Sequence, residues 1–264
     1  MKLSTYHLHT TFCDGKNTAE EMVLEAIRLG CPEIGFSGHS HLPFNPSWTM
    51  KKEDVPVYVE TIKALREKYK DKIKIYIGIE QDYFSESPDW GPDYIIGAVH
   101  CIYKDGEYFD VDASAEVMRE NVDKHYGGDV YAYCEDYFAL MADLYNKTKC
   151  DIIAHFDLVT KFNEKMPMID TSHPRYVKAS NDALDALLKT PAIFEMNTGA
   201  ITRGYRTTPY PSEELTAKIA KSGKKFVINS DTHSTSTLGT HLDELSRIFD
   251  KLGYKYITRL EEIL

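Results

Sequence analysis

Two histidines near the start of the chain are separated by a single leucine, in the stretch STYHLHTTFCDG at 4–15. Successive side chains of a β-strand point to opposite faces, so His7 and His9 would share one face while Leu8 points to the other. Imidazole is the commonest metal ligand, but histidines also serve as hydrogen-bonded core or surface residues. The pair alone therefore leaves both interpretations open, and the rest of the chain must decide between them.

Short apolar runs recur along the chain, and nearly every run ends in a histidine, an acidic residue or an asparagine. They are TYHLHT, EIGFSGHSH, KIYIGIEQDYF, YIIGAVH, CDIIAHFD, AIFEMNTG and KFVINSDTH. In α/β barrels the C-terminal ends of the strands converge on one face, where active sites are assembled. The candidate metal ligands at these ends are His7, His9, Asp14, His39, Glu80, His100, His155, Asp231 and His233.

This mixture of imidazoles and carboxylates suits zinc, manganese or iron better than calcium or magnesium. An ion that keeps one coordination position open for water or substrate uses about three protein ligands. Nine ligands with one bridging carboxylate therefore predict a cluster of three divalent transition-metal ions.

Amphipathic stretches separate the apolar runs and predict helices at 18–30, 54–69, 114–147 with a break at the glycine pair 127–128, 174–189, 212–222 and 239–252. Seven strand candidates that alternate with helices are typical of a parallel α/β sheet. No glycine-rich phosphate-binding turn follows the first run, which argues against an open dinucleotide-binding sheet. We therefore expect a single α/β domain over 1–264, folded as a seven-stranded barrel with the metal site at the C-terminal ends of its strands.

Composition narrows the class of protein. With 42% hydrophobic and 27% charged residues the chain is typical of globular proteins with a substantial core, and its net charge of −10 argues against a nucleic-acid partner. No run approaches the roughly 20 apolar residues of a membrane helix, and the N-terminus lacks a signal-peptide pattern. The five cysteines include no CxxC pair and fit free thiols in a reducing compartment. We expect a cytoplasmic protein with a small-molecule partner, and the sequence leaves its oligomeric state open.

The order and spacing of the candidate ligands resemble those of the PHP (polymerase and histidinol phosphatase) superfamily. The matching motifs are HLH at 7–9, GHSH at 38–41, GIE at 78–80, AVH at 98–100, AHFD with its histidine at 155, and SDTH at 230–233. The chain length and the stretch NTGAITRGYRTTPYPS at 197–212 are similar to the stand-alone histidinol-phosphate phosphatase branch. This resemblance implies a distorted (β/α)7 barrel and a phosphatase that hydrolyses L-histidinol phosphate to L-histidinol and phosphate in histidine biosynthesis.

The resemblance also implies how the ligands are shared among the ions. The first ion would be held by His7, His9, Glu80 and Asp231, the second by Glu80, His100 and His155, and the third by Asp14, His39 and His233. Glu80 would then bridge the first two ions. Asp14 stands where many members of the family have a histidine, so the third site departs from the family pattern.

Three divalent ions and the carboxylates of Asp14, Glu80 and Asp231 would leave the pocket with about three positive charges, which suits a phosphate dianion. The mechanistic hypothesis is direct attack on phosphorus by a hydroxide that bridges the first two ions, with Glu80 and Asp231 in catalytic positions. His41 is a candidate acid for protonating the leaving alkoxide. An ordinary loop position explains His41 equally well.

Further polar residues near the strand ends are candidates for substrate binding. A planar guanidinium suits bidentate phosphate binding, which favours Arg203 and Arg206, and Lys161 is a third cationic candidate. Asp82 and Asp157 each follow a ligand position, where they could pair with the amine or imidazole of a substrate or orient a ligand histidine. Surface positions for the cations remain the competing interpretation.

Two alternative functions stay open. A phosphodiesterase or exonuclease of the same superfamily would use the same ions with a more open, basic cleft, and the acidic balance of the chain counts against it. A non-catalytic metal-binding regulatory domain is the second alternative. An intact ligand set with room for water counts against that alternative.

Overall fold

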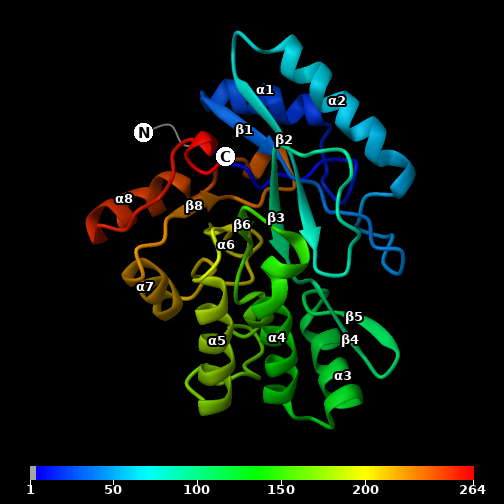
Figure 1. Ribbon diagram of the computed structural model, residues 1–264, viewed down its shortest axis with the longest axis vertical. Coiled ribbons are helices and arrows are strands. Elements are labelled where there is room, and N and C mark those ends of the chain that lie inside the picture. The colour runs from blue at the N-terminus through cyan, green and yellow to red at the C-terminus, as the bar shows by residue number, and fades with distance from the viewer. Residues whose placement is uncertain (1–3) are drawn as a thin grey trace.

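The computed structural model describes residues 4–264, and its centre is a curled, parallel β-sheet (Figure 1). The strands follow the order β1-β2-β3-β6-β7-β8, and every neighbouring pair is parallel. Their bounds are β1 Glu33–Phe36, β2 Lys74–Asp82, β3 Tyr94–Ala98, β6 Ile152–Ile153, β7 Ile193–Asn197 and β8 Phe226–Asn229.

The N-terminal segment closes the sheet by running between its two edge strands. Thr5 forms a parallel bridge with Ile34 of β1, and Leu8 forms one with Thr232, just after β8. The backbone N–H of His9 donates to the carbonyl of Thr232 at 2.9 Å. These are isolated bridges instead of a continuous ladder, which makes the barrel irregular. The predicted first strand is thus present only as these bridges, but with it seven segments enclose the barrel, and the predicted distorted (β/α)7 architecture is confirmed.

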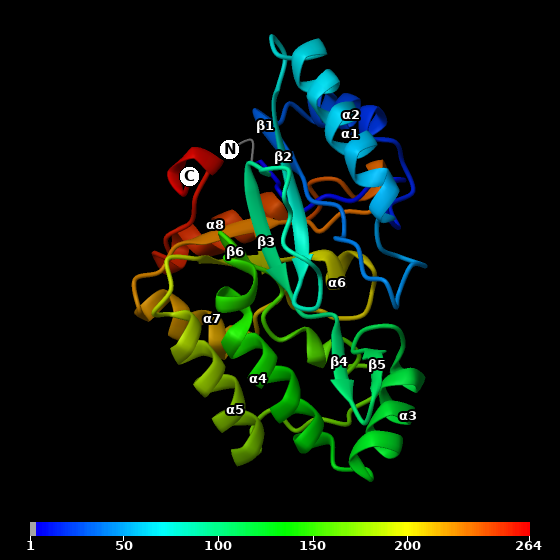
Figure 2. The ribbon, with the colours of Figure 1, turned by 45° about the vertical axis from the view of Figure 1, so that its right-hand side comes forward.

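All of the predicted helical stretches form helices, and most of them lie around the outside of the sheet, whereas the helix over 115–126 packs against the next helix (Figure 2). The α-helices are α1 Ala19–Leu29, α2 Val55–Lys68, α3 Ala115–Tyr126, α4 Val130–Thr148, α5 Pro174–Leu187, α6 Gly199–Thr202, α7 Glu213–Lys221 and α8 Leu242–Leu252. The 3-10 helices are η1 Lys52–Asp54, η2 Leu158–Thr160, η3 Thr235–Thr237 and η4 Leu260–Glu262. The predicted break after α3 is confirmed, because Gly127 ends that helix in the left-handed conformation with φ of 60°. No helix within residues 4–264 combines the length and apolar character needed to span a membrane.

An antiparallel hairpin was missed by the sequence analysis. It consists of β4 (Cys101–Lys104) and β5 (Glu107–Asp110), and it follows directly after β3. Asp105 and Gly106 form its two-residue turn, both with positive φ, which is the turn chemistry that tight hairpins favour. The hairpin matters for function because Asp110, at its C-terminal end, lines the cavity at the C-terminal ends of the strands.

Apolar and tyrosine side chains fill the N-terminal half of the barrel and leave its C-terminal end for polar residues. The ring of Tyr94 occupies the space beside Gly35 and Gly78, where a Cβ atom would lie 2.3 Å and 2.4 Å from its atoms. Its hydroxyl donates to the carbonyls of Tyr6 and Phe36. The other members of this cluster are Tyr76, Ile96, Ala98, Ile152, Ala154, Ile193, Val227, Ile257 and Leu260.

Candidate metal centre

All nine predicted ligands meet at the C-terminal end of the barrel. The N-terminal segment carries two of them, Glu80 lies within β2, and the others follow β1, β3, β6 and β8 or lie in the first loop. Seven of them line a cavity of about 400 Å³. The other two, His7 and His9, are fully buried beside these lining residues. The parallel strand ends therefore converge as the sequence pattern indicated, with the ligands supplied by several separate parts of the chain.

Glu80 lies in the middle of the cluster and is fully buried. Its Oε1 is 3.0 Å from His155 Nε2 and 3.3 Å from His100 Nε2. Its Oε2 is 3.1 Å from His7 Nε2 and 2.8 Å from His39 Nδ1. The two oxygens thus face two different groups of imidazoles, which is the arrangement that a bridging carboxylate requires.

Asp231 approaches the cluster from β8. Its Oδ1 lies 3.4 Å from His9 Nε2 and 3.7 Å from His7 Nε2, while its Oδ2 accepts a hydrogen bond from Arg203 Nη2 at 3.0 Å. The backbone of Asp231 has φ of 47°, a left-handed conformation that is uncommon outside glycine and often marks functional sites. The strained turn places one carboxylate oxygen against the imidazoles and the other against the guanidinium.

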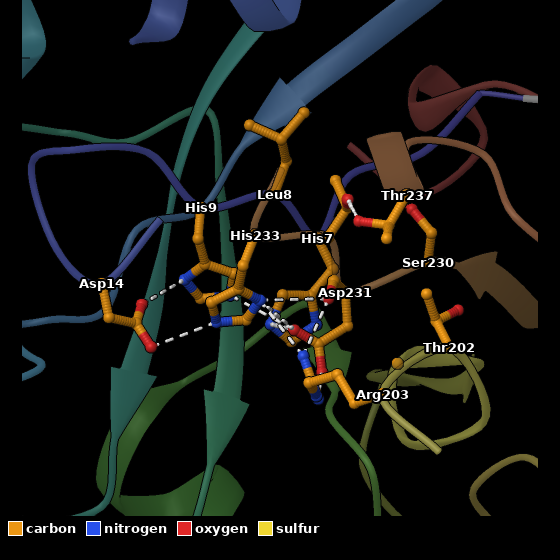
Figure 3. A network of polar contacts seen from close by, with 12 residues as sticks. His7, Leu8, His9, Asp14, Thr202, Arg203, Ser230, Asp231, His233 and Thr237 are labelled. Carbon is orange, nitrogen blue, oxygen red and sulfur yellow. Dashed lines mark hydrogen bonds and ion pairs between the residues drawn. The ribbon is translucent and has the colours of Figure 1, made fainter. Parts of the chain in front are cut away.

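A third group of donors lies nearer the surface. Asp14 Oδ2 is 3.2 Å from His233 Nε2, and its Oδ1 is 3.6 Å from His39 Nε2. The rings of His9 and His233 stack with centroids 4.0 Å apart. Figure 3 shows Asp14 facing His9 and His233 on one side of the cluster and Arg203 reaching Asp231 on the other. The Asp14 side chain is 32% exposed, so this group is the most accessible of the cluster.

The donor atoms satisfy a test for metal binding that does not depend on any motif. Within residues 4–264, His7 Nε2, His9 Nε2 and Glu80 Oε2 are buried and lie close to other donor atoms, but none of the three makes a hydrogen bond of good geometry. Burial together with the neighbouring His233 and His39 lowers the pKa of His9 to about 3, so its imidazole is neutral. Buried polar atoms without partners are rare in native proteins unless water or an ion satisfies them. Neutral nitrogen and ionised oxygen donors that face one another fit divalent transition metals.

Residues 4–264 contain four groups of residues that could hold a metal ion, and within each group the donor atoms lie within 4.8 Å of one another. They are His7, His9 and Asp231; His7, Glu80 and His155; His39, Glu80 and His100; and His9, Asp14, His39 and His233. Three histidines belong to two sets each, so the ligands are more closely shared than the family resemblance implied.

Electrostatics ties the cluster together. Burial alone would raise the pKa of Glu80, but the imidazoles around it, led by His7, outweigh burial and hold the pKa well below its usual range. Burial likewise opposes the charged form of His7, yet Glu195 and Glu80 raise the pKa of His7 well above its usual value. Glu80 is therefore ionised, and His7 binds a proton tightly whenever no cation competes for it.

Glu195 is a buried residue of this centre that the sequence analysis did not select. It lies in β7, and its Oε1 is 2.6 Å from His7 Nδ1. Its only signal in the sequence is an acidic residue inside the apolar run AIFEMNTG. A carboxylate in the middle of a buried strand requires a partner, and that requirement could have drawn attention to it.

The predicted substrate-binding residues separate into two groups. Arg203 and Lys161 line the cavity. Arg206, Asp82, Asp157 and His41 are not among its lining residues. The structure therefore brings two of the three predicted cations to the place where a substrate would lie.

The other predicted residues have partners of their own. Arg206 is buried and donates to Thr160 Oγ1 at 2.8 Å, with Asp157 Oδ2 3.8 Å from its Nη1. Asp82 Oδ2 accepts the backbone N–H of His100 at 3.0 Å and lies 3.3 Å from its Nδ1. Asp82 thus takes the orienting position that was one of its two predicted alternatives.

His41 lies beside a different cavity, of about 770 Å³, whose lining is rich in aromatic residues. Its Nδ1 is 3.1 Å from the carbonyl oxygen of Met50. His39 and His41 are two residues apart, but His39 forms a bridge with Glu80 of β2, whereas His41 contacts the loop at Met50. His41 does not point into the metal-ligand cavity in this structure.

Two carboxylates of the cavity wall come from the missed hairpin and the turn after it. Asp110 Oδ1 accepts hydrogen bonds from Asn45 Nδ2 and Cys101 Sγ. Asp112 Oδ2 lies 2.9 Å from Lys161 Nζ. Burial alone would raise the pKa of Asp112, but Lys161 and a nearby imidazole lower it to about 2. The wall opposite the metal ligands is therefore both anionic and cationic.

Comparison with known proteins agrees with this geometry. The family model described as PHP domain matches residues 5–199. This chain belongs to the PHP domain family. The matched range includes seven of the nine ligands, and only the pair that follows β8 lies beyond it.

Curated relatives of this PHP chain extend over nearly its whole length. A protein of Deinococcus radiodurans named "Probable histidinol-phosphatase" is 28% identical over 268 residues, which cover 96% of this chain and 94% of the relative. The histidinol-phosphatase of Bacillus subtilis is 26% identical over 259 residues, covering 88% of this chain and 94% of the relative.

A solved structure shares the fold of this PHP chain. The histidinol phosphate phosphatase of Lactococcus lactis, crystallised with zinc, L-histidinol and phosphate, superposes with a TM-score of 0.71. It is 20% identical, and the superposition covers 97% of this chain and 95% of that chain. The barrel that the strand pattern predicted is thus the fold of this solved structure as well.

The Glu80→Gln variant tests the bridging position. Replacing one carboxylate oxygen by an amide weakens two groups of donors at once, so we expect metal retained after dialysis to fall by at least half and turnover to fall by at least about a hundredfold. Elemental analysis of dialysed protein and steady-state kinetics measure both. Glu86→Gln is a matched control at an exposed ion pair with Lys52. Metal content and turnover equal to wild type in Glu80→Gln would contradict a bridging carboxylate.

The acid limb of activity should depend on metal concentration. The pKa values of His7 and His100 are raised well above the usual value by neighbouring carboxylates that outweigh burial. Protons therefore compete with cations for these imidazoles as the pH falls, and metal affinity is lost on the acid side. Added Zn²⁺ or Mn²⁺ should move the acid limb of kcat to lower pH. An acid limb that stays fixed over a hundredfold range of metal concentration would assign the loss to another group.

Proposed function

We propose that this chain is a metal-dependent phosphomonoesterase that hydrolyses L-histidinol phosphate to L-histidinol and phosphate. The observation that carries the proposal is a cluster of nine ligands beneath a cavity whose wall holds Arg203 and Lys161. The near full-length relatives named histidinol-phosphatase support the choice of substrate. The Lactococcus lactis structure with zinc, L-histidinol and phosphate supports both the ion and the ligand class.

The proposed cofactors are up to three divalent ions drawn from zinc, manganese and iron. The ligand sets are those that the family resemblance implied, centred on Glu80 as the bridge, with Asp14, His39 and His233 forming the outer site. When bound, such ions lower the pKa of a coordinated water and neutralise charge on phosphoryl oxygens. The orphaned nitrogens of His7 and His9 support the inner positions most directly.

Arg203 would orient the phosphate. Its Nη2 donates to Asp231 Oδ2, and its Nη1 donates to the carbonyl of Asp231 at 3.1 Å. These bonds hold the guanidinium at the edge of the ligand cluster while 32% of its side chain stays exposed toward the cavity. A guanidinium fixed in this way can donate to a phosphoryl oxygen with little loss of side-chain entropy.

Asp110 and Asp112 are the proposed partners of the cationic amine of the substrate. Both line the cavity, whereas the carboxylates of Asp82 and Asp157 are occupied by buried contacts outside its wall. An ammonium group that is desolvated without a partner costs several kcal/mol. Within residues 4–264, Asp110 Oδ2 and Asp112 Oδ1 accept no hydrogen bond, so each aspartate retains capacity to accept one from the substrate.

A panel of phosphate esters tests the proposed function. We expect kcat/KM for L-histidinol phosphate to exceed that for glycerol phosphate by at least about a hundredfold, which corresponds to roughly 2.7 kcal/mol of differential transition-state binding. Bis-p-nitrophenyl phosphate serves as the diester control. A ratio near one would refute the substrate assignment, and a nucleotide diester as the best substrate would favour the alternative phosphodiesterase.

Asp112→Asn tests recognition of the amine. We expect kcat/KM for L-histidinol phosphate to fall by about ten- to a hundredfold, because the amide cannot neutralise the ammonium. The value for propyl phosphate, which lacks an amine, should change by less than about threefold. The amine-free ester separates loss of recognition from any disturbance of Lys161, and Asp105→Asn at the hairpin turn is the matched control. Equal losses for the two esters would contradict amine binding at Asp112.

A further inference from the structure

Glu195 occupies a position where four parts of the barrel meet, and it is completely buried. Its Oε1 accepts from His7 Nδ1 at 2.6 Å and from Asn229 Nδ2 at 3.0 Å. Its Oε2 accepts from the backbone N–H of His155 at 3.0 Å and from Asn197 Nδ2 at 2.9 Å. The four donors come from the N-terminal segment, β8, the end of β6 and β7 itself.

Every one of these partners is a hydrogen-bond donor. A carboxylate can accept all four bonds only when it is ionised, because a protonated carboxyl would present a donor to one of them. Among residues 4–264, His7 alone forms an ion pair with Glu195. The charge of Glu195 therefore acts on the ligand cluster mainly through the imidazole of His7.

His7 lies between carboxylates on opposite sides of its ring, with Glu195 on one side and Glu80 and Asp231 on the other. Nδ1 faces Glu195, while Nε2 lies 3.1 Å from Glu80 Oε2 and 3.7 Å from Asp231 Oδ1. The bond to Glu195 favours a proton on Nδ1, so that a neutral His7 ring directs the lone pair of Nε2 at the ligand cluster. The same carboxylate holds the backbone of His155, whose Nε2 faces the other oxygen of Glu80.

We propose that Glu195 is a positioning residue for the metal centre, acting on the ligands at both sides of Glu80. It fixes the Nδ1–H tautomer and the ring orientation of His7, and it anchors the peptide that presents His155. This inference rests on the proposed metal-dependent function. Carboxylates that accept the second N–H of a ligand histidine commonly change metal affinity by 10–100-fold when they are removed.

The nearest equivalent is Asp82, which accepts the backbone N–H of His100 and also faces its ring. His100 Nδ1 lies 3.3 Å from Asp82 Oδ2, which is a longer contact, and His9 Nδ1 lies 3.5 Å from Cys13 Sγ. Glu195 is distinguished by the short contact to His7 and by its simultaneous hold on a second ligand. A change at this one side chain should therefore affect the inner ligands more than the outer group at Asp14.

Glu195→Gln is the decisive substitution because it preserves size and removes one acceptor. Whichever way the amide points, its NH2 group meets two donors, either His7 Nδ1–H with Asn229 or the N–H of His155 with Asn197. The first orientation drives His7 toward the Nε2–H tautomer, which cannot bind a metal through Nε2. Competition with a chromophoric chelator for Zn²⁺ should show affinity at the tightest site lower by about 10–100-fold.

Glu33→Gln is the matched control. Glu33 is also fully buried and accepts from the Tyr6 hydroxyl, the Leu260 N–H and Arg259, but it lies at the opposite end of the barrel. We expect its variant to keep wild-type zinc affinity even if its unfolding midpoint falls. Wild-type affinity in Glu195→Gln, or an equal loss in Glu33→Gln, would overturn the proposal.

A second measurement uses the wild-type protein and so does not depend on the folding of a variant. Long-range ¹⁵N–¹H NMR of the zinc-loaded chain should find the His7 proton on Nδ1, and a proton on Nε2 would overturn the assigned position of Glu195. Neither readout involves turnover. Failure of the histidinol phosphate assay with normal zinc binding would therefore refute the proposed substrate and leave the positioning of His7 standing.

Discussion

The carboxylate of Glu80 inside a shell of imidazoles is the interaction on which the rest of the structure depends. A buried carboxylate costs several kcal/mol unless opposite charge and hydrogen bonds compensate it. In this chain the compensation comes from histidines that follow β1, β3 and β6 and from the N-terminal segment, so no single element can satisfy Glu80 alone. The barrel must therefore bring all of these strand ends together before the centre exists.

Closure of the barrel by the N-terminal segment meets this requirement. The bridges at Thr5 and Leu8 place His7 and His9 on the inner face, while Leu8 packs outward with 0% exposure. Glu195 then orients His7 from behind and Glu80 faces it from the front. The same short segment thus completes the sheet and supplies the ligands of its centre, so the fold and the metal site depend on one another.

The sequence predicted the parts that follow a periodic pattern. The ligands stand at the ends of apolar runs, so their convergence follows from parallel strand topology, and helix boundaries such as the break at Gly127 follow from glycine conformations. Residues whose position depends on loop paths could not be predicted in this way. His41 is near His39 in the sequence but turns toward another cavity, and Arg206 is buried against Thr160 while Arg203 reaches Asp231. Asp110 lies at the cavity because a hairpin is inserted between β3 and α3, where the alternation of strands and helices predicts none. Glu195 was missed because it lies within an apolar run.

Anomalous X-ray diffraction from crystals of the zinc-reconstituted protein measures the metal centre most directly. The structure leads us to expect up to three anomalous peaks at the C-terminal end of the barrel, two of them on opposite sides of the Glu80 carboxylate and a third beside Asp14, His39 and His233. A single peak at saturating zinc, with Glu80 contacting one ion through one oxygen only, would contradict the bridging centre.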